Sequence, residues 1–196
     1  MDHVAELAPR EVSTIHRSFT GALLASALVA IWGCSDVKSP GDEADVKAGA
    51  AATDFTTRDV DGNTFRLSDH LGKETILIDF WATWCQPCMA EMPHLQRMYD
   101  QYKSKGFLVV AVSMDGPDTM ADVPAFSKRN NMNFPVVLDE DSRIASIYNP
   151  RKSAPESVII DKTGRIFAVR EGYNPGDEAY VEKDVLKVLD QAAAAK

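Results

Sequence analysis

Two runs of consecutive apolar residues mark the centre of the globular part of the chain. Residues 75–82, TILIDFWA, and residues 107–113, FLVVAVS, are rich in β-branched and aromatic side chains, as strands buried on both faces are. Between them, apolar residues recur at three-to-four spacing from Met92 to Tyr102, which predicts a helix that ends near Gly106. This pattern predicts a βαβ unit with two parallel strands.

The remaining elements of the body are shorter. Their predicted ranges are 54–57, 64–66, 134–138, 157–161 and 165–171 for strands, and 123–131 and 181–189 for helices. Turn signals at 61–63 and 161–164 predict hairpins, and Asp122 is expected to cap the helix that starts at 123. The sequence therefore predicts an α/β fold: a mixed central β-sheet flanked by helices, with an N-terminal β-hairpin and a central insertion between about Gly116 and Tyr148.

The N-terminal part of the chain has a different pattern. An uncharged apolar run of 14 residues at 19–32 follows Arg17 and ends at Gly33 and Cys34. A helix of that length is shorter than the ~30 Å hydrocarbon core of a bilayer, so a signal peptide fits the run better than a permanent membrane span. A buried core helix is the alternative interpretation.

Residues 31–34, Ile-Trp-Gly-Cys, resemble the lipobox of bacterial lipoproteins, in which cleavage leaves a diacylated cysteine at the new N-terminus. We expect Cys34 to be lipidated. The alternatives are a plain thiol beside an uncleaved signal anchor, or removal of Cys34 with the signal. A lipid anchor and a signal anchor would both tether the chain to a membrane.

We therefore expect three segments: a signal peptide at 1–33, a tether at 34–52 and a globular domain at 53–196. The tether has no aromatic and almost no branched apolar side chains, so it cannot offset the entropy of ordering and is expected to be flexible.

Composition and charge exclude several classes of protein. The formal net charge of −8 leaves no basic stripe for phosphates, so nucleic acid is not expected as a partner, and the acidic surface favours a monomer. Three cysteines are too few for a disulfide-stapled mini-protein. Cys85 and Cys88 are separated by only two residues, which indicates chemistry rather than scaffolding.

Cys85 and Cys88 lie where the first core strand gives way to its helix. Unpaired N–H groups and the positive end of the helix dipole favour a thiolate at Cys85, whereas Cys88, one turn further in, should be more buried. Thiol–disulfide exchange then takes two steps: the Cys85 thiolate attacks a substrate disulfide, and Cys88 resolves the mixed disulfide. This chemistry needs no cofactor beyond the Cys85–Cys88 disulfide itself.

Two other interpretations of the cysteine pair were weighed. A zinc site would need further ligands, but there is no second CxxC, and only His70 and His94 remain after removal of the signal, so no metal is expected. A purely structural disulfide across a two-residue loop would constrain the unfolded chain little.

Residues 79–88, DFWATWCQPC, resemble the active-site segment of thioredoxin. Together with residues 84–93, WCQPCMAEMP, residues 153–161, SAPESVIID, and the segment from Asp59 to Ser68, they make the chain similar to the TlpA/ResA-type membrane-anchored thiol-disulfide oxidoreductases over about residues 53–190. The resemblance implies a thioredoxin-like fold and periplasmic or extracytoplasmic placement. It also implies protein disulfides as substrates, often those of apocytochrome c before haem attachment, and a membrane thiol electron donor.

The resemblance also assigns residues around the pair. Pro155 matches the family's cis-proline, which faces the disulfide and helps bind the substrate backbone; an ordinary turn proline is the alternative. Ala154 before it offers the substrate no side-chain hydrogen bond. Pro87 fits the first turn of the helix, and Trp84 is expected to shield the disulfide and provide a contact face, whereas Trp81 is expected to pack in the core.

Two carboxylates could take the proton that Cys88 must lose. Asp79 matches the buried acid of thioredoxin, and Glu91 matches the acid typical of the membrane-anchored group. A buried carboxylate can have a raised pKa and act as a base, and its charge opposes thiolate formation. For Glu91 the alternative is a solvated helix residue. We expect Asp79→Asn to slow resolution by Cys88 more than Glu91→Gln.

Two other functions are possible on the same fold. A thiol peroxidase would use the Pro-x-x-x-Thr/Ser-x-x-Cys arrangement of peroxiredoxins, but Ile78 and Ala82 occupy the proline and hydroxyl positions here. A copper-binding chaperone would use the soft sulfurs of the pair, but the metallochaperones of this fold have a wider cysteine spacing and a distal histidine, and no histidine follows His94. An extracytoplasmic disulfide reductase is the preferred interpretation.

Overall fold

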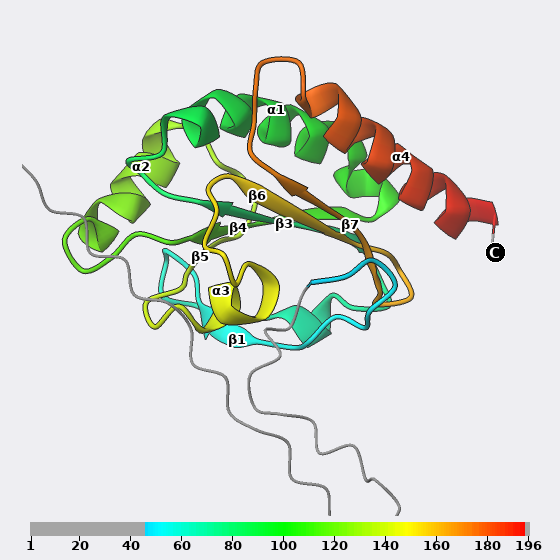
Figure 1. The fold of residues 1–196 in the computed structure, drawn as a ribbon, viewed down its shortest axis with the longest axis horizontal. Helices are drawn as coiled ribbons and strands as arrows, with labels where there is room; N and C mark the ends of the chain where they lie inside the picture. The colour runs from blue at the N-terminus through cyan, green and yellow to red at the C-terminus, as the bar shows by residue number, and fades with distance from the viewer. Residues whose placement is uncertain (1–45, 195–196) are drawn as a thin grey trace, which may run out of the picture. The chain divides into compact units, whose positions relative to one another are not determined.

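The computed structural model describes residues 46–194 and shows a five-stranded mixed sheet with strand order β5-β4-β3-β6-β7 (Figure 1). Its strands are β3 (Thr75–Trp81), β4 (Phe107–Ser113), β5 (Val136–Leu138), β6 (Glu156–Ile160) and β7 (Ile166–Glu171). The signal peptide at 1–33, the lipidation of Cys34 and most of the tether are predictions that lie outside the described residues.

The centre of the sheet is the predicted βαβ unit. β3 and β4 are parallel, in register from Thr75 opposite Phe107 to Trp81 opposite Ser113, and every residue of both strands is buried. β6 pairs with the other side of β3 in the antiparallel direction, and β7 follows it as a hairpin. Both apolar runs are continuous because helices or loops cover both faces of the sheet.

The side chains of β3 alternate between two hydrophobic clusters. Leu77 and Trp81 belong to the cluster formed with α1 (Gln86–Tyr102), α2 (Val123–Arg129) and α4 (Glu178–Ala194). Ile76, Ile78 and Phe80 belong to the other cluster, together with residues of α3 (Arg143–Tyr148) and of the N-terminal hairpin. Figure 1 shows α1 and α4 on one side of the sheet, and α3 and β1 on the other. Asp79 lies between Leu77 and Trp81 and therefore faces α1.

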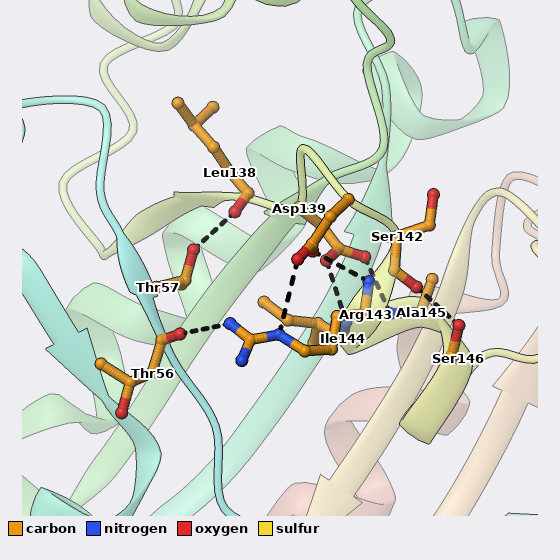
Figure 2. Close-up of polar contacts among 10 residues, drawn as sticks. Thr56, Thr57, Leu138, Asp139, Ser142, Arg143, Ile144, Ala145 and Ser146 are labelled. Atoms are coloured by element: carbon orange, nitrogen blue, oxygen red, sulfur yellow. Dashed lines mark hydrogen bonds and ion pairs between the residues drawn. The ribbon is translucent and has the colours of Figure 1, made fainter.

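The predicted N-terminal hairpin consists of β1 (Thr56–Arg58) and β2 (Thr64–Arg66), and it covers the outer edge of β5. The Val60 N–H donates to the Val136 carbonyl at 2.9 Å, and the Thr57 hydroxyl donates to the Leu138 carbonyl at 2.7 Å. Figure 2 shows the second contact, together with the Arg143 guanidinium, which donates to the Thr56 carbonyl at 2.9 Å. The edge of the sheet is thus closed by a segment far away in the sequence.

The short helix α3 was not predicted from the sequence. It has six residues, which are too few to show a helical period. Its first turn is stabilised by the side chain of the buried Asp139. The two carboxylate oxygens of Asp139 accept hydrogen bonds from the N–H groups of Ile144 at 2.9 Å and Ala145 at 2.8 Å (Figure 2). These bonds serve N–H groups that the helix itself leaves unpaired.

Asp122 does not cap α2 as predicted. Its side chain makes no cap hydrogen bond, because a 3-10 turn at Met120–Asp122 runs directly into the helix and gives Asp122 a helical backbone. Two short strands also differ slightly from their predicted ranges: β1 starts at Thr56 rather than 54, and β5 starts at Val136, after Pro135, which has no N–H to donate.

Residues 46–52, which the sequence assigned to the flexible tether, are part of the domain. The Gly49 N–H donates to the Ile166 carbonyl at 2.7 Å, and the Ile166 N–H donates to the Ala50 carbonyl at 2.9 Å. Val46 and Ala52 pack against the cluster that contains α3. This segment therefore covers the start of β7, the other edge strand. None of the helices within residues 46–194 has the length and apolar character needed to cross a membrane.

Candidate active site

The cysteine pair sits at the start of α1, where β3 has just ended. Cys85 is the N-cap residue with an extended backbone, and Pro87 lies in the first turn, where a missing N–H costs nothing. Cys85 and Cys88 form a disulfide with their Cα atoms 5.3 Å apart, and the Cys88 N–H donates to Cys85 Sγ at 3.3 Å. Cys88 is fully buried, whereas Cys85 keeps a small exposed area, so the predicted order of burial is confirmed.

The loop that carries Trp84 is anchored by Asp115, a residue that sequence reasoning missed. Its buried carboxylate accepts hydrogen bonds from the Thr83 N–H at 3.0 Å, from the Thr83 hydroxyl, and from the Ser113 hydroxyl at 2.9 Å. Asp115 follows β4, and because the carboxyl ends of parallel strands meet at one edge, that position could have suggested it. Trp84 itself is 61% exposed, whereas Trp81 is in the core as predicted.

Pro155 approaches the pair from β6. The Ala154–Pro155 peptide bond is cis, as predicted, and Pro155 is buried. Because β6 is antiparallel to β3, with Glu156 opposite Phe80, its first residues lie beside the end of β3 that leads to Cys85. Ala154 packs against the cluster that contains both cysteines. The register thus places Pro155 and Ala154 at the end of the sheet where the cysteine pair lies, and their part in binding substrate stays a prediction.

Asp79 is completely buried on the α1 side of β3. The Ser157 hydroxyl donates to its Oδ1 at 3.2 Å, while Oδ2 has no hydrogen-bond partner among residues 46–194. Loss of hydration on burial raises the pKa of Asp79, and the hydrogen bond from Ser157 lowers it by less. In the sequence Ser157 is one residue of the segment 153–161, and no spacing identifies it as the partner of Asp79.

Glu91 is also buried, with 3% of its surface exposed, so the alternative of a solvated helix residue is wrong. Its Oε2 has no hydrogen-bond partner in the described part of the chain. Burial raises the pKa of Glu91, and the negative charges of Asp79, Asp177 and Glu178 raise it further. The last two come from the start of α4 and the loop before it, more than 80 residues along the sequence, which is why the helix pattern alone could not show the burial.

Another buried carboxyl, Glu156, directly follows the cis-proline, and no pattern in the sequence points to it. Burial raises the pKa of Glu156 to about 7, the neighbouring Glu171 raises it, and Arg151 lowers it. Glu171 lies opposite Glu156 on β7 and accepts a hydrogen bond from Arg151 at 2.7 Å. Two carboxyls therefore lie side by side where β6 begins and β7 ends, and Arg151 compensates the charge of Glu171.

The two histidines weighed as metal ligands lie in other settings. His70 stacks on Phe65 and pairs with Glu74 at 2.6 Å, on the hairpin side of the sheet. His94 is partly exposed on α1, 3.7 Å from Glu178. Across residues 46–194, no three or more histidine, cysteine or acidic side chains come together in a group that could hold a metal ion. At the positions relevant to a peroxidase, Ile78 and Ala82 are buried apolar side chains.

Known proteins are similar to this chain in sequence and in fold. The profile of the AhpC/TSA family matches residues 48–169. The thiol-disulfide oxidoreductase ResA of Geobacillus kaustophilus is 35% identical over 127 residues, which are 65% of this chain and 71% of the relative. ResA of Bacillus cereus is 34% identical over 144 residues, 72% of this chain and 81% of the relative.

Solved structures extend the comparison to three dimensions. A Chlorobium tepidum protein assigned as the thiol:disulfide interchange protein DsbE superimposes with a TM-score of 0.68 at 33% identity, covering 74% of this chain and 99% of that one. The thioredoxin domain of a thiol-disulfide oxidoreductase of Bacteroides vulgatus superimposes with a TM-score of 0.59 at 27% identity, covering 71% and 98%. The predicted fold class is thus confirmed.

Proposed function

Because the chain belongs to the AhpC/TSA family and is a thiol-disulfide oxidoreductase of the ResA type, we propose that it reduces disulfides in exported proteins outside the cytoplasm. The observation that carries the reducing direction is the burial of Asp79 and Glu91 near the Cys85–Cys88 pair. Negative charge near a thiol disfavours the thiolate. A pair whose reduced form is not stabilised as thiolate gives up its electrons readily, in contrast to strongly oxidising pairs.

The reaction follows from the positions of the two sulfurs. Cys85, at the N-cap and slightly exposed, attacks the substrate disulfide as a thiolate and forms a mixed disulfide. The buried Cys88 then loses its proton and attacks Cys85 Sγ, which closes the disulfide and releases the second substrate thiolate. Two electrons pass from the dithiol to the substrate. Trp84, Pro155 and Ala154 border the pair, which supports a role for them in holding the substrate backbone.

This reaction implies two kinds of partner, a substrate and an electron donor. Extracytoplasmic proteins with a disulfide are the substrates, with apocytochrome c as one candidate, and a membrane thiol donor returns the electrons that each turnover removes. The apolar run at 19–32 and Cys34 support export and a lipid anchor, and these features of the sequence lie outside the described residues. We propose that the mature chain works as a monomer attached to the membrane.

The reduction potential of the protein tests the direction. The chain is equilibrated against glutathione or dithiothreitol buffers, and alkylation of Cys85 and Cys88 reports the reduced fraction. A potential near that of thioredoxin, about −270 mV or lower, supports a reductase that needs a donor. A potential near −120 mV, about that of the oxidant DsbA, would reverse the proposed direction.

The membrane attachment is tested separately. Cells that express the full chain are labelled with a fatty acid and fractionated. Loss of both the label and the membrane association in Cys34→Ser supports a lipid anchor. Membrane association that survives Cys34→Ser would support an uncleaved signal anchor instead.

A further inference from the structure

A cavity of about 150 Å³ lies beside Glu91, where β6, the end of β7 and the start of α4 meet. It is lined by Glu91, Ser157, Arg170, Glu171, Gly172, Tyr173, Asp177, Tyr180 and Val181. Most of these residues are polar, and a liquid water molecule takes up about 30 Å³, so the cavity is large enough and polar enough for several water molecules.

The two buried carboxyls reach this cavity in different ways. Glu91 lines it directly. Asp79 is not among the lining residues, but its Oδ1 accepts the hydrogen bond of Ser157, and Ser157 does line the cavity. Each carboxyl also has one buried oxygen without a partner in residues 46–194. A buried oxygen without a partner is costly, so a proton or a water molecule is needed at these sites.

Ser157 is the structural link between Asp79 and the cavity. A serine hydroxyl can donate one hydrogen bond and accept another at the same time, which is what a proton-transfer chain requires. We propose that Ser157 connects Asp79 to water in the cavity, and that the proton released by Cys88 leaves the protein by this route. Ser157 acts through Asp79 and is therefore a positioning residue. The proposal rests on the thiol–disulfide exchange described above.

The proton balance of the resolving step shows why a route is needed. The S–H bond of Cys88 breaks, its sulfur forms a bond with Cys85 Sγ, and the bond between Cys85 and the substrate sulfur breaks with release of a substrate thiolate. One proton remains in the interior after each turnover. It passes to Asp79, and the hydrogen bond that Ser157 donates to the carboxylate then reverses. The protonated Asp79 donates to Ser157 Oγ while the Ser157 hydroxyl donates to cavity water, from which the proton reaches solvent. The carboxyl is restored and can accept the next proton.

The charges around the cavity favour movement of a proton toward solvent. The titratable and charged groups that face Glu91 or the cavity are Asp79, His94, Arg170, Glu171, Tyr173, Asp177, Glu178 and Tyr180. Arg170 is held by Asp184 at 2.8 Å, which compensates its charge. Glu171 is held in the same way by Arg151 at 2.7 Å, so Asp177, which has no ion pair among residues 46–194, provides the negative charge that attracts a proton along the route.

The test compares two side chains of nearly the same shape at position 157. Threonine keeps the hydroxyl and valine removes it, and both suit a strand beside a cavity with room for a methyl group. All variants carry Cys34→Ser, so that only the pair reacts. The reduced full chain is mixed with one equivalent of dithiobis-nitrobenzoate: Cys85 releases the first coloured thiolate and Cys88 releases the second. Ser127→Ala, which removes a buried serine lining another cavity, is the control.

We expect the second phase to be about tenfold slower in Ser157→Val than in Ser157→Thr, since proton transfer by a positioned group contributes large factors to such steps. The first phase should be the same in both. Ser157→Val should also shift the pH profile of the second phase upward, because it removes the hydrogen bond that lowers the pKa of Asp79. Ser127→Ala should leave both readouts as in the wild type.

Equal second-phase rates and pH profiles for Ser157→Val and Ser157→Thr would overturn the proposal. The absence of a second phase in the wild type would instead defeat the exchange reaction on which the proposal rests, so the two failures are distinguishable. If Ser157→Val slowed both phases, the cause would be a general loss of structure rather than the loss of a proton route. That result would also count against the proposal.

Discussion

Asp139 and Asp79 are two buried aspartates on opposite faces of the sheet, and they use their oxygens differently. Both oxygens of Asp139 accept hydrogen bonds from backbone N–H groups at the start of α3. Asp79 receives one hydrogen bond, from Ser157, and its other oxygen has no partner within the described residues. The comparison teaches that a buried carboxylate with its oxygens satisfied organises the chain, whereas one left unsatisfied is suited to taking up a proton.

The same comparison holds near the cysteine pair. Asp115 accepts hydrogen bonds from Thr83 and Ser113 and fixes the loop that carries Trp84, so it resembles Asp139. Glu91 resembles Asp79, because it is buried with one oxygen unpaired among residues 46–194. Carboxylates of both kinds therefore occur in the elements around the cysteine pair.

Replacement of Asp139 by alanine is expected to have the largest effect on stability, because two N–H groups lose their partner at once. Each buried unsatisfied group costs roughly 1–3 kcal/mol, so the free energy of unfolding should fall by about 3 kcal/mol. Equilibrium denaturation measures the loss. Glu140→Ala, an exposed residue of the same loop, is the control, and a loss no larger than in that control would show that the cap is not needed.

Asp79→Asn is expected to slow the resolving step by about a hundredfold, which corresponds to about 2.7 kcal/mol, because the proton of Cys88 loses its acceptor. Glu91→Gln should slow it less, since Asp79 and its link through Ser157 remain. The decay rate of a mixed disulfide on Cys85 measures both. Equal decay rates in the two variants would contradict the ranking.

The same substitution should change how stability depends on pH. The pKa of Asp79 is raised in the folded state, so its contribution to stability is complete below the ordinary carboxyl pKa of about 4 and is lost as pH rises through the raised value. In Asp79→Asn no carboxyl titrates at this position, so this loss of stability at higher pH does not occur. At neutral pH the variant should be more stable than the wild type by about 2 kcal/mol, and the difference should shrink toward pH 4. Denaturation at several pH values measures it, and a difference independent of pH would refute the assignment.

The smallest effect is expected for Asp115→Asn. The amide keeps one acceptor oxygen, so the Thr83 loop loses part of its support and the free energy of unfolding should fall by about 1 kcal/mol. Unlike Asp79→Asn, this variant should show no gain in stability at neutral pH. Such a gain, measured in the same pH series, would remove the distinction between the two kinds of carboxylate.

Much of the fold was predictable because its central elements carry strong local signals. The apolar runs of β3 and β4 and the period of α1 predicted the βαβ unit, and the motif around Cys85 predicted the enzyme class, which the comparisons confirm. The cis conformation of Pro155 followed from the resemblance rather than from the residue itself.

The rest depended on contacts between distant segments. α3 has too few residues for a period and starts at hydrogen bonds from Asp139. The burial of Glu91 comes from the α4 region, and the support of Asp79 comes from Ser157 on a strand 78 residues away. Residues 46–52 resemble a linker because most of their side chains are small, yet their backbone pairs with Ile166. Composition does not report backbone hydrogen bonds.

The pairing of residues 49–52 with the start of β7 matters to anyone who shortens this protein. A chain cut at Thr53, where the apolar pattern begins, would lose the N–H donors of Gly49 and Ala52 and leave the carbonyls of Gly164 and Ile166 bare on an edge strand. Edge strands with unpaired backbone groups pair with strands of neighbouring molecules, so such a fragment should self-associate. A fragment that starts at Val46 should stay monomeric. The few residues that look most dispensable are thus those that keep copies of the protein apart.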